Sequence, residues 1–225
     1  MRTASWYLRL CALLALLSAL GCDETQGRGQ ASGGKKGDGR QAAKKQGDHP
    51  AGAPMPKLLE AEGGDVGLDM VKGAAEDAPG RGDRYRASGG RCVYVPPNTN
   101  VGPKKKNPKG HVRLTFTAPK DGKYYIHPRV WWTDGCSNSM GLIISQNGKA
   151  RRETVFTNST YKAWQWFKFP SPDPASEHPR AFRLKAGECV LTFTNQEDNV
   201  KLDQVYVTDD PEDAPAGVME PEEDE

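Results

Sequence analysis

The stretch that decides the fold is HVRLTFTAPKDGKYYIHPRVWW, residues 111–132. Its first eight residues alternate, with Val112, Leu114 and Phe116 on one face, and this pattern is typical of a half-buried β-strand. A turn signal at 120–122 separates that strand from a second run that is rich in β-branched and aromatic residues. The stretch therefore predicts two short consecutive strands that bury one face.

Four further runs share this character: GLIIS (141–145), AWQWFKF (163–169), ECVLTFT (188–194) and KLDQVYV (201–207). Turn signals lie between them, and no stretch keeps a helical period beyond one or two turns. Many short strands at this spacing predict an all-β sandwich or jelly roll. We place this single domain at residues 55–208, which is long enough for one hydrophobic core.

An export signal is predicted at residues 1–21, where two arginines precede the apolar run LCALLALLSAL. A run of about eleven residues is too short to span a bilayer and fits a signal peptide. The sequence Ala19-Leu20-Gly21-Cys22 resembles the lipobox of bacterial lipoproteins, in which the cysteine carries the lipid. We expect lipidation at Cys22; the alternative is ordinary cleavage with an incidental cysteine. The expected location is the bacterial cell envelope, with the choice between inner and outer membrane left open.

The two flanks differ from the domain in composition. Residues 22–54 contain no aromatic residue and no aliphatic residue larger than alanine, so they predict a disordered tether. Residues 209–225 hold nine acidic residues and no basic one, which predicts a disordered acidic tail that aids solubility or contacts a basic partner. The domain between them holds 23 basic and 16 acidic residues, a net charge of +7 that the bulk value of +2 conceals. This charge suggests an acidic polysaccharide as partner, and the tail would compete for the same surface.

Nucleic-acid binding and catalysis find little support in the sequence. The basic run PKKKNPKG (103–110) lacks interleaved aromatic residues, so we interpret it as a solvated loop. The four histidines fall in unrelated contexts, and neither HExxH nor GxSxG occurs. Carboxylate pairs for glycoside hydrolysis are not excluded by spacing alone. We expect a binding protein that is not an enzyme.

Three carboxylates suggest a metal site. The side-chain period of two places Glu60 and Glu62 on one face of LLEAE (58–62), and it places Asp203 on the face of the core valines in LDQVYV (202–207). Such a carboxylate is costly unless it is paired or binds a cation, and hard oxygen ligands suit Ca²⁺. The alternatives are neutralisation by Arg or Lys, or a place at the solvated rim.

Several segments resemble carbohydrate-binding modules of families 6 and 35 and their galactose-binding-like relatives. They are LLEAEGGDVG (58–67), ASGGRCVYVP (87–96), RVWWTDGCSNSMGLIIS (129–145), AWQWFKF (163–169) and the closing run 184–210. The resemblance implies a β-sandwich jelly roll over residues 57–210. It also implies a structural calcium ion held by Glu60, Glu62 and Asp203.

The same resemblance implies a sugar site in the loops at one end of the sandwich. By rough alignment its residues are Tyr85, Trp164 and Asn199, and Asn138 is a further hydrogen-bonding candidate. The alternation in AWQWFKF places its two tryptophans on the face opposite its phenylalanines, and one of Trp131 and Trp132 must also face outward. The alternative is that the tryptophans are packing residues.

Export permits disulfides, but the domain has three cysteines, Cys92, Cys136 and Cys189. At least one therefore stays unpaired or pairs between chains, and the sequence leaves the pairing open. Taken together, we expect a lipid-anchored envelope protein that binds a polysaccharide or glycan without catalysis. The alternative is a protein-interaction or structural lipoprotein that keeps the sandwich but has no sugar site, and a more remote one is a hydrolase acting on envelope polymer.

Overall fold

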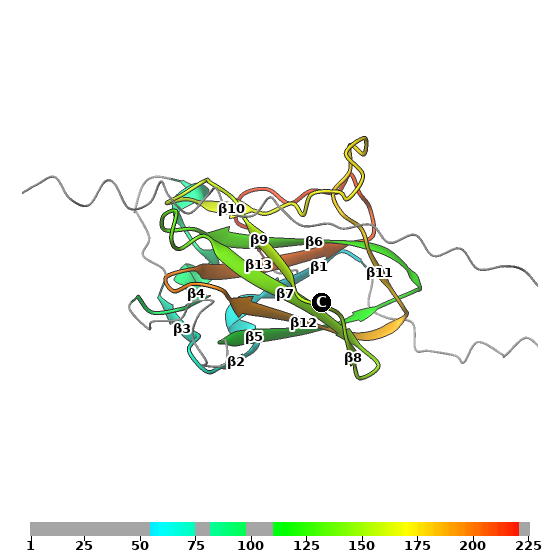
Figure 1. Cartoon of the computed structure of the whole chain (residues 1–225), viewed down its shortest axis with the longest axis horizontal. Coiled ribbons are helices and arrows are strands. Elements are labelled where there is room, and N and C mark those ends of the chain that lie inside the picture. The colour runs from blue at the N-terminus through cyan, green and yellow to red at the C-terminus, as the bar shows by residue number, and fades with distance from the viewer. Residues whose placement is uncertain (1–54, 75–81, 98–109, 221–225) are drawn as a thin grey trace, which may run out of the picture. The chain divides into compact units, whose positions relative to one another are not determined.

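The computed structural model describes residues 55–74, 82–97 and 110–220, which all belong to one compact unit (Figure 1). The signal peptide, Cys22 and the tether lie outside the described residues. No helix within the described ranges is both long and apolar enough to cross a membrane.

The domain is a sandwich of two antiparallel sheets, as predicted. Sheet A contains β1 (Lys57–Glu60), β3 (Val71–Ala74), β4 (Arg91–Tyr94), β6 (Gly122–Trp131), β10 (Trp164–Trp166), β11 (Phe182–Leu184) and β13 (Lys201–Thr208). Sheet B contains β2 (Asp65–Gly67), β5 (His111–Ala118), β7 (Ser139–Gln146), β8 (Lys149–Ala150), β9 (Thr154–Thr157) and β12 (Gly187–Asn195). Three short 3₁₀ turns complete the described elements: η1 (Ala61–Gly63), η2 (Asp83–Tyr85) and η3 (Ser88–Gly90).

The strand order places distant segments of the chain side by side. Sheet A runs β10-β6-β13-β4-β3, with β1 beside β13 and β11 beside β6; sheet B runs β2-β5-β12-β7-β8, with β9 beside β7. The last strand, β13, therefore lies in the middle of sheet A and also pairs with the first strand, from Lys57 opposite Val207 to Glu60 opposite Gln204. The two ends of the predicted domain meet there.

The core lies between the sheets and follows the predicted alternation. Strand β5 buries Val112, Leu114 and Phe116, and its intervening residues are exposed. Aromatic rings fill one part of the core, where Phe156 contacts the rings of Trp132, Phe167, Phe169 and Phe193 at centroid distances of 4.9–6.3 Å. Burying such a ring stabilises the fold by roughly 1.5–3 kcal/mol.

The predicted strand at 163–169 is shorter in the structure, where β10 covers Trp164–Trp166. Its faces are nevertheless as predicted. Phe167 and Phe169 belong to the core between the sheets, and Trp164 packs in a separate cluster with Ala87 and Cys92. Of the two adjacent tryptophans, Trp132 belongs to the core and Trp131 packs against that second cluster.

The outer face of sheet A is covered, which explains why all eight residues of β13 are buried. The segment 83–90 lies against one part of it, through the cluster with Trp164 and through hydrogen bonds to Arg129. The segment 209–220 lies against another part, through hydrogen bonds to Gln204 and Trp166. On the outer face of sheet B, alternate residues of β5 are exposed.

Candidate functional site

A buried ion pair joins the two central strands of sheet A. The Arg129 guanidinium donates to Oδ2 of Asp203, and the side chains are 2% and 0% exposed. Arg129 also donates to the carbonyl of Arg86 at 3.1 Å and to that of Asp83 at 2.5 Å, and it lies 5.6 Å from the ring centroid of Trp164. One side chain thus fastens the segment 83–90 to the sheet.

Asp203 does not share the face of the core valines, contrary to the prediction from strict alternation. The pairing of β13 with β6 shifts between Leu202 and Val205, and both of these residues belong to the core. A bulge of this kind interrupts the period of two. It leaves Asp203 on the side of Arg129, and its Oδ1 accepts the N–H of Ser88 at 3.0 Å.

Burial raises the pKa of Asp203 to about 7, although Arg129 and the N–H of Ser88 both favour the ionised carboxylate. Burial also raises the pKa of Glu60, with a smaller contribution from the charge of Glu62. Oε1 of Glu60 accepts hydrogen bonds from the Ser88 hydroxyl at 3.0 Å and from the Gln204 amide at 2.7 Å. The predicted carboxylates thus share a polar region.

The three predicted calcium ligands differ in whether their carboxylate oxygens are available to a cation. Glu60 and Glu62 each keep a buried Oε2 that has no hydrogen-bond partner among the described residues, and a hard cation would satisfy both oxygens. Asp203 already has Arg129 as its cation, which is the neutralisation that the sequence left open. No group of three His, Cys, Asp or Glu side chains within the described ranges is arranged to hold a metal ion. Glu62 also lies beyond the strand, in η1, because β1 ends at Glu60.

The predicted sugar residues do not form one open cleft. Trp164 is only 4% exposed, because Ala87 and Cys92 pack against it and the ring of Trp131 lies 5.7 Å away. Tyr85 is half-buried in η2, which contacts β10. Trp164 therefore corresponds to the packing alternative.

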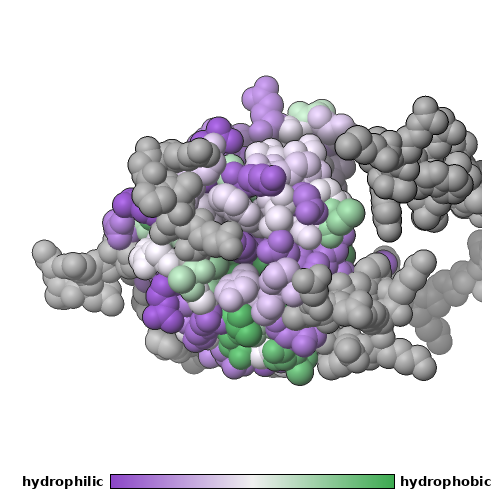
Figure 2. All heavy atoms as spheres, turned by 90° about the vertical axis from the view of Figure 1, so that its left-hand side faces the viewer, coloured by the Kyte–Doolittle hydropathy of each residue, from purple (hydrophilic) through white to green (hydrophobic). Residues whose placement is uncertain are grey.

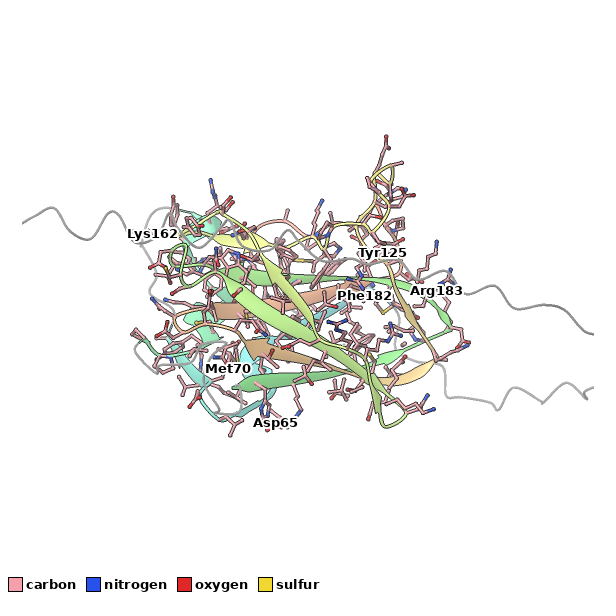
Figure 3. The ribbon with its side chains drawn as sticks, viewed as in Figure 1. Asp65, Met70, Tyr125, Lys162, Phe182 and Arg183 are labelled. Carbon is pink, nitrogen blue, oxygen red and sulfur yellow. The ribbon has the colours of Figure 1, made fainter. Side chains whose placement is uncertain are left out.

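Asn138 and Asn199 lie in loops that follow the ends of strands. The side-chain amide of Asn138 donates to the Asn158 carbonyl at 3.3 Å and to the Tyr161 hydroxyl at 3.4 Å, whereas Asn199 has a φ of 56° and bonds through its backbone to Val95. Tyr161 is 39% exposed, and we did not predict it. Its neighbour Lys162 lies at the end of the sandwich opposite Phe182 and Arg183 (Figure 3). Tyr161 lies in the segment that connects β9 with β10, where the alternation of a strand gives no information about exposure.

A row of five side chains crosses the outer face of sheet A at this end. Direct cross-strand pairing connects Trp164 with Trp131, Trp131 with Lys201, Lys201 with Tyr94, and Tyr94 with Val71. Directly opposed residues project to the same face, so these five form one line, which we call the aromatic row. Sequence reasoning missed the row because it depends on the register of five strands.

Exposure differs along the aromatic row. Trp131 and Tyr94 are half-buried, and Val71 at the edge is 36% exposed. Gly73 lies beside the Tyr94 ring, where a Cβ would come within 2.5 Å of a ring carbon, so a larger residue here would displace that ring. Figure 2 looks onto this end of the molecule, where hydrophilic side chains predominate around a small hydrophobic area.

The acidic tail is not disordered over its first part, contrary to the prediction. Residues 209–220 are described, and both polar groups of the Gln204 amide bond the main chain of Met219, at 2.6 and 3.3 Å. The indole N–H of Trp166 donates to the Gly217 carbonyl at 3.0 Å, and the Tyr206 hydroxyl donates to Asp213 at 2.7 Å. We call residues 209–220 the strap. The last five residues lie outside the described ranges.

Two surface grooves lie away from the predicted sugar residues. One, of about 450 Å³, separates the strap from the loop 168–179, and the contact between His178 Nδ1 and Glu212 Oε1 at 3.1 Å lies in its wall. The other, of about 570 Å³, lies between β1 and β5 and is lined by Leu58, Glu60 and Leu114 among others. Neither groove contains a side chain of the aromatic row.

None of the three cysteines in the described part of the chain forms a disulfide. Cys189 belongs to the core between the sheets, Cys92 belongs to the cluster on the outer face of sheet A, and Cys136 is exposed in a loop. Burial raises the pKa of the Cys189 thiol to about 12. The cysteines are therefore separate, which the sequence left open.

No protein-family model matches the sequence, and no curated protein matches it. Solved structures with a similar fold include a family 35 carbohydrate-binding module from Clostridium thermocellum, at 16% identity over 68% of this chain and 98% of that one, with a TM-score of 0.45. A carbohydrate-binding module of Cellvibrio mixtus lichenase 5A, in complex with cellotriose, matches at 13% identity over 68% and 95%, with a TM-score of 0.43. An exo-β-1,3-galactanase from Phanerochaete chrysosporium matches at 18% identity over 68% of this chain, with a TM-score of 0.43, and the match spans only 29% of that enzyme.

Proposed function

We propose that this protein is a non-catalytic carbohydrate-binding lipoprotein of the cell envelope. The observation that carries the proposal is the aromatic row, in which the half-buried rings of Trp131 and Tyr94 lie on one face of sheet A. A sugar presents an apolar C–H face as well as hydroxyls, and aromatic side chains provide large rigid surfaces for such a face. Polar groups in the loops at this end, including the amide of Asn138, supply hydrogen-bonding partners.

Glycan-array binding of the full mature chain tests the proposal. Trp131→Ala should remove most of the binding, because it deletes one of the two rings that flank the centre of the row. Val155→Ala is the control, since it removes an exposed apolar side chain on β9 of sheet B, away from the row. A wild-type protein that binds no glycan contradicts the function, and loss of binding only in Val155→Ala contradicts the site.

A second candidate is a protein-interaction or structural lipoprotein without a sugar site. It is favoured by the burial of Trp164 and by the strap, which takes up the indole N–H of Trp166. Under this alternative neither the wild type nor either variant binds a glycan on the array. A protein partner should copurify with the full chain.

Membrane attachment through Cys22 is the part of the proposal that rests on sequence alone. Acylation of that residue would anchor the tether and leave the sandwich free of the lipid surface. Mass spectrometry of the mature N-terminus should find acyl chains on Cys22, and Cys22→Ser should release the protein from the membrane fraction. An unmodified Cys22, or cleavage at another position, contradicts the anchor.

A structural Ca²⁺ at Glu60 and Glu62, with Asp203 nearby, is also proposed. Its support is the two buried carboxylate oxygens that have no hydrogen-bond partner in the described part of the chain. Added Ca²⁺ should raise the melting temperature of the wild type and EDTA should lower it, whereas Glu62→Gln should show neither shift. Asp65→Asn is the control, because that carboxylate is exposed and paired with Arg113. Identical melting curves in Ca²⁺ and EDTA refute the site.

A further inference from the structure

A lysine lies in the middle of the aromatic row. Lys201 pairs with Trp131 on one side and with Tyr94 on the other, and its side chain extends over the Trp131 ring, with Nζ 5.6 Å from the ring centroid. The residue is only 9% exposed. None of the described residues forms an ion pair or hydrogen bond with its ammonium group.

The contact of the ammonium group with the indole ring is a cation–π contact, which stabilises the charge modestly. The alkyl stem is covered along the ring while the ammonium end stays within reach of solvent, as is common for long cationic side chains. The ammonium group is therefore accessible to an anion from solution.

The neighbouring cation on the same face is already satisfied. Arg129 has the carboxylate of Asp203 and two backbone carbonyls as acceptors. The other members of the aromatic row are a valine and three aromatic residues, which carry no negative charge. An anion from outside the chain would thus meet Lys201 between the rings of Trp131 and Tyr94.

We propose that Lys201 binds the anionic substituent of an acidic glycan whose sugar rings lie against Trp131 and Tyr94. The inference rests on the proposed carbohydrate-binding function and names the class of glycan. The shared chemistry is a carboxylate of a uronic acid or a sulfate ester, each of which accepts charge-assisted hydrogen bonds from an ammonium group. The net charge of +7 on residues 55–208 favours the approach of such a polymer.

Binding of the full mature chain to four polymers tests the inference. Polygalacturonate is compared with its methyl-esterified form, and dextran sulfate with dextran, so that each pair differs only in the anionic group. Lys201→Gln should weaken binding to the preferred charged polymer by about tenfold or more, the effect of one charge-assisted hydrogen bond. Lys201→Arg should retain most of the affinity. Lys123→Gln is the matched control, because it removes an exposed lysine near the start of β6, at the other end of the strand from Trp131.

The outcomes separate this inference from the function on which it depends. Preference for one charged polymer, lost in Lys201→Gln and kept in Lys123→Gln, supports the inference and identifies carboxylate or sulfate as the ligand. Equal binding to charged and uncharged polymers, unchanged in Lys201→Gln, overturns the inference but leaves carbohydrate binding standing. Equal losses in both lysine variants also overturn it, because they indicate attraction by net charge alone. Failure of the wild type to bind any polymer overturns the proposed function itself.

Discussion

Replacing Arg129 by methionine should destabilise the domain by about 3–5 kcal/mol at pH 8, because it leaves the charge of Asp203 buried without a counter-ion. The magnitude follows from the burial of the pair, whose side chains are 2% and 0% exposed. Methionine retains much of the volume of the arginine stem but donates no hydrogen bond. The carbonyls of Arg86 and Asp83 lose a donor as well, so the segment 83–90 should loosen first.

The cost should depend on pH with a definite sign. Burial raises the pKa of Asp203 in the folded protein to about 7, above its ordinary value of 3.8. The folded state therefore holds this proton to a higher pH than the unfolded chain does, so Asp203 favours folding below about pH 4 and loses that contribution as the pH rises through about 7. At pH 5.5 the carboxyl is largely protonated, and the loss of Arg129 should cost less than it does at pH 8.

Urea unfolding followed by tryptophan fluorescence at both pH values measures this difference. Arg113→Met is the control, because its ion pair with Asp65 is exposed and should contribute less than about 1 kcal/mol. The double variant Arg129→Met with Asp203→Leu should be more stable than Arg129→Met alone, since no buried charge remains. An Arg129→Met cost that equals the control, or that is the same at pH 5.5 and pH 8, refutes the reasoning.

Two further predictions concern the strap and the thiols. Gln204→Ala should accelerate amide hydrogen exchange across residues 209–220, because it removes both hydrogen bonds from the Gln204 amide to the main chain of that segment. Gln146→Ala is the control and should not change this exchange, although Gln146 makes the same pair of bonds to Lys185. Unchanged exchange in Gln204→Ala contradicts a docked strap. Cys136 is exposed and should react rapidly with a thiol reagent in the native protein. Cys189 should react only after unfolding, because this cysteine is buried and the pKa of its thiol is raised to about 12. Rapid labelling of Cys189 in the native protein would count against its place in the core.

Local sequence patterns predicted the strands because a sheet with one buried face forces a period of two on its residues. Residues 111–118 form β5 with the predicted faces, and the phenylalanines of the run 163–169 point to the core as expected. The pattern failed at Asp203, where a bulge adds a residue between Leu202 and Val205. No local signal distinguishes this bulge from regular alternation, because the residues on both sides of it are apolar.

The candidate site was predictable only in part. The sequence identified Glu60, Glu62 and Asp203 as carboxylates in need of partners, and they do lie in one polar region. It did not identify Arg129 as the partner of Asp203, because the two residues are 74 positions apart in the chain. The tail at 209–225 was expected to be disordered because its composition is polar. Its first part is held by hydrogen bonds from the Gln204 amide and the Trp166 indole N–H to backbone carbonyls of residues 217 and 219.

The sequence by itself determined the class of fold and the uneven distribution of charge, because periodicity, turn residues and composition are local properties. Only the tertiary structure decided which residues meet. Trp131, Lys201 and Tyr94 become neighbours through the register of three strands, and Trp164 is buried by a segment that no pattern within its own strand reveals. Strand pairing brings together residues that are distant in the chain, so a site on the face of a sheet is a property of the register.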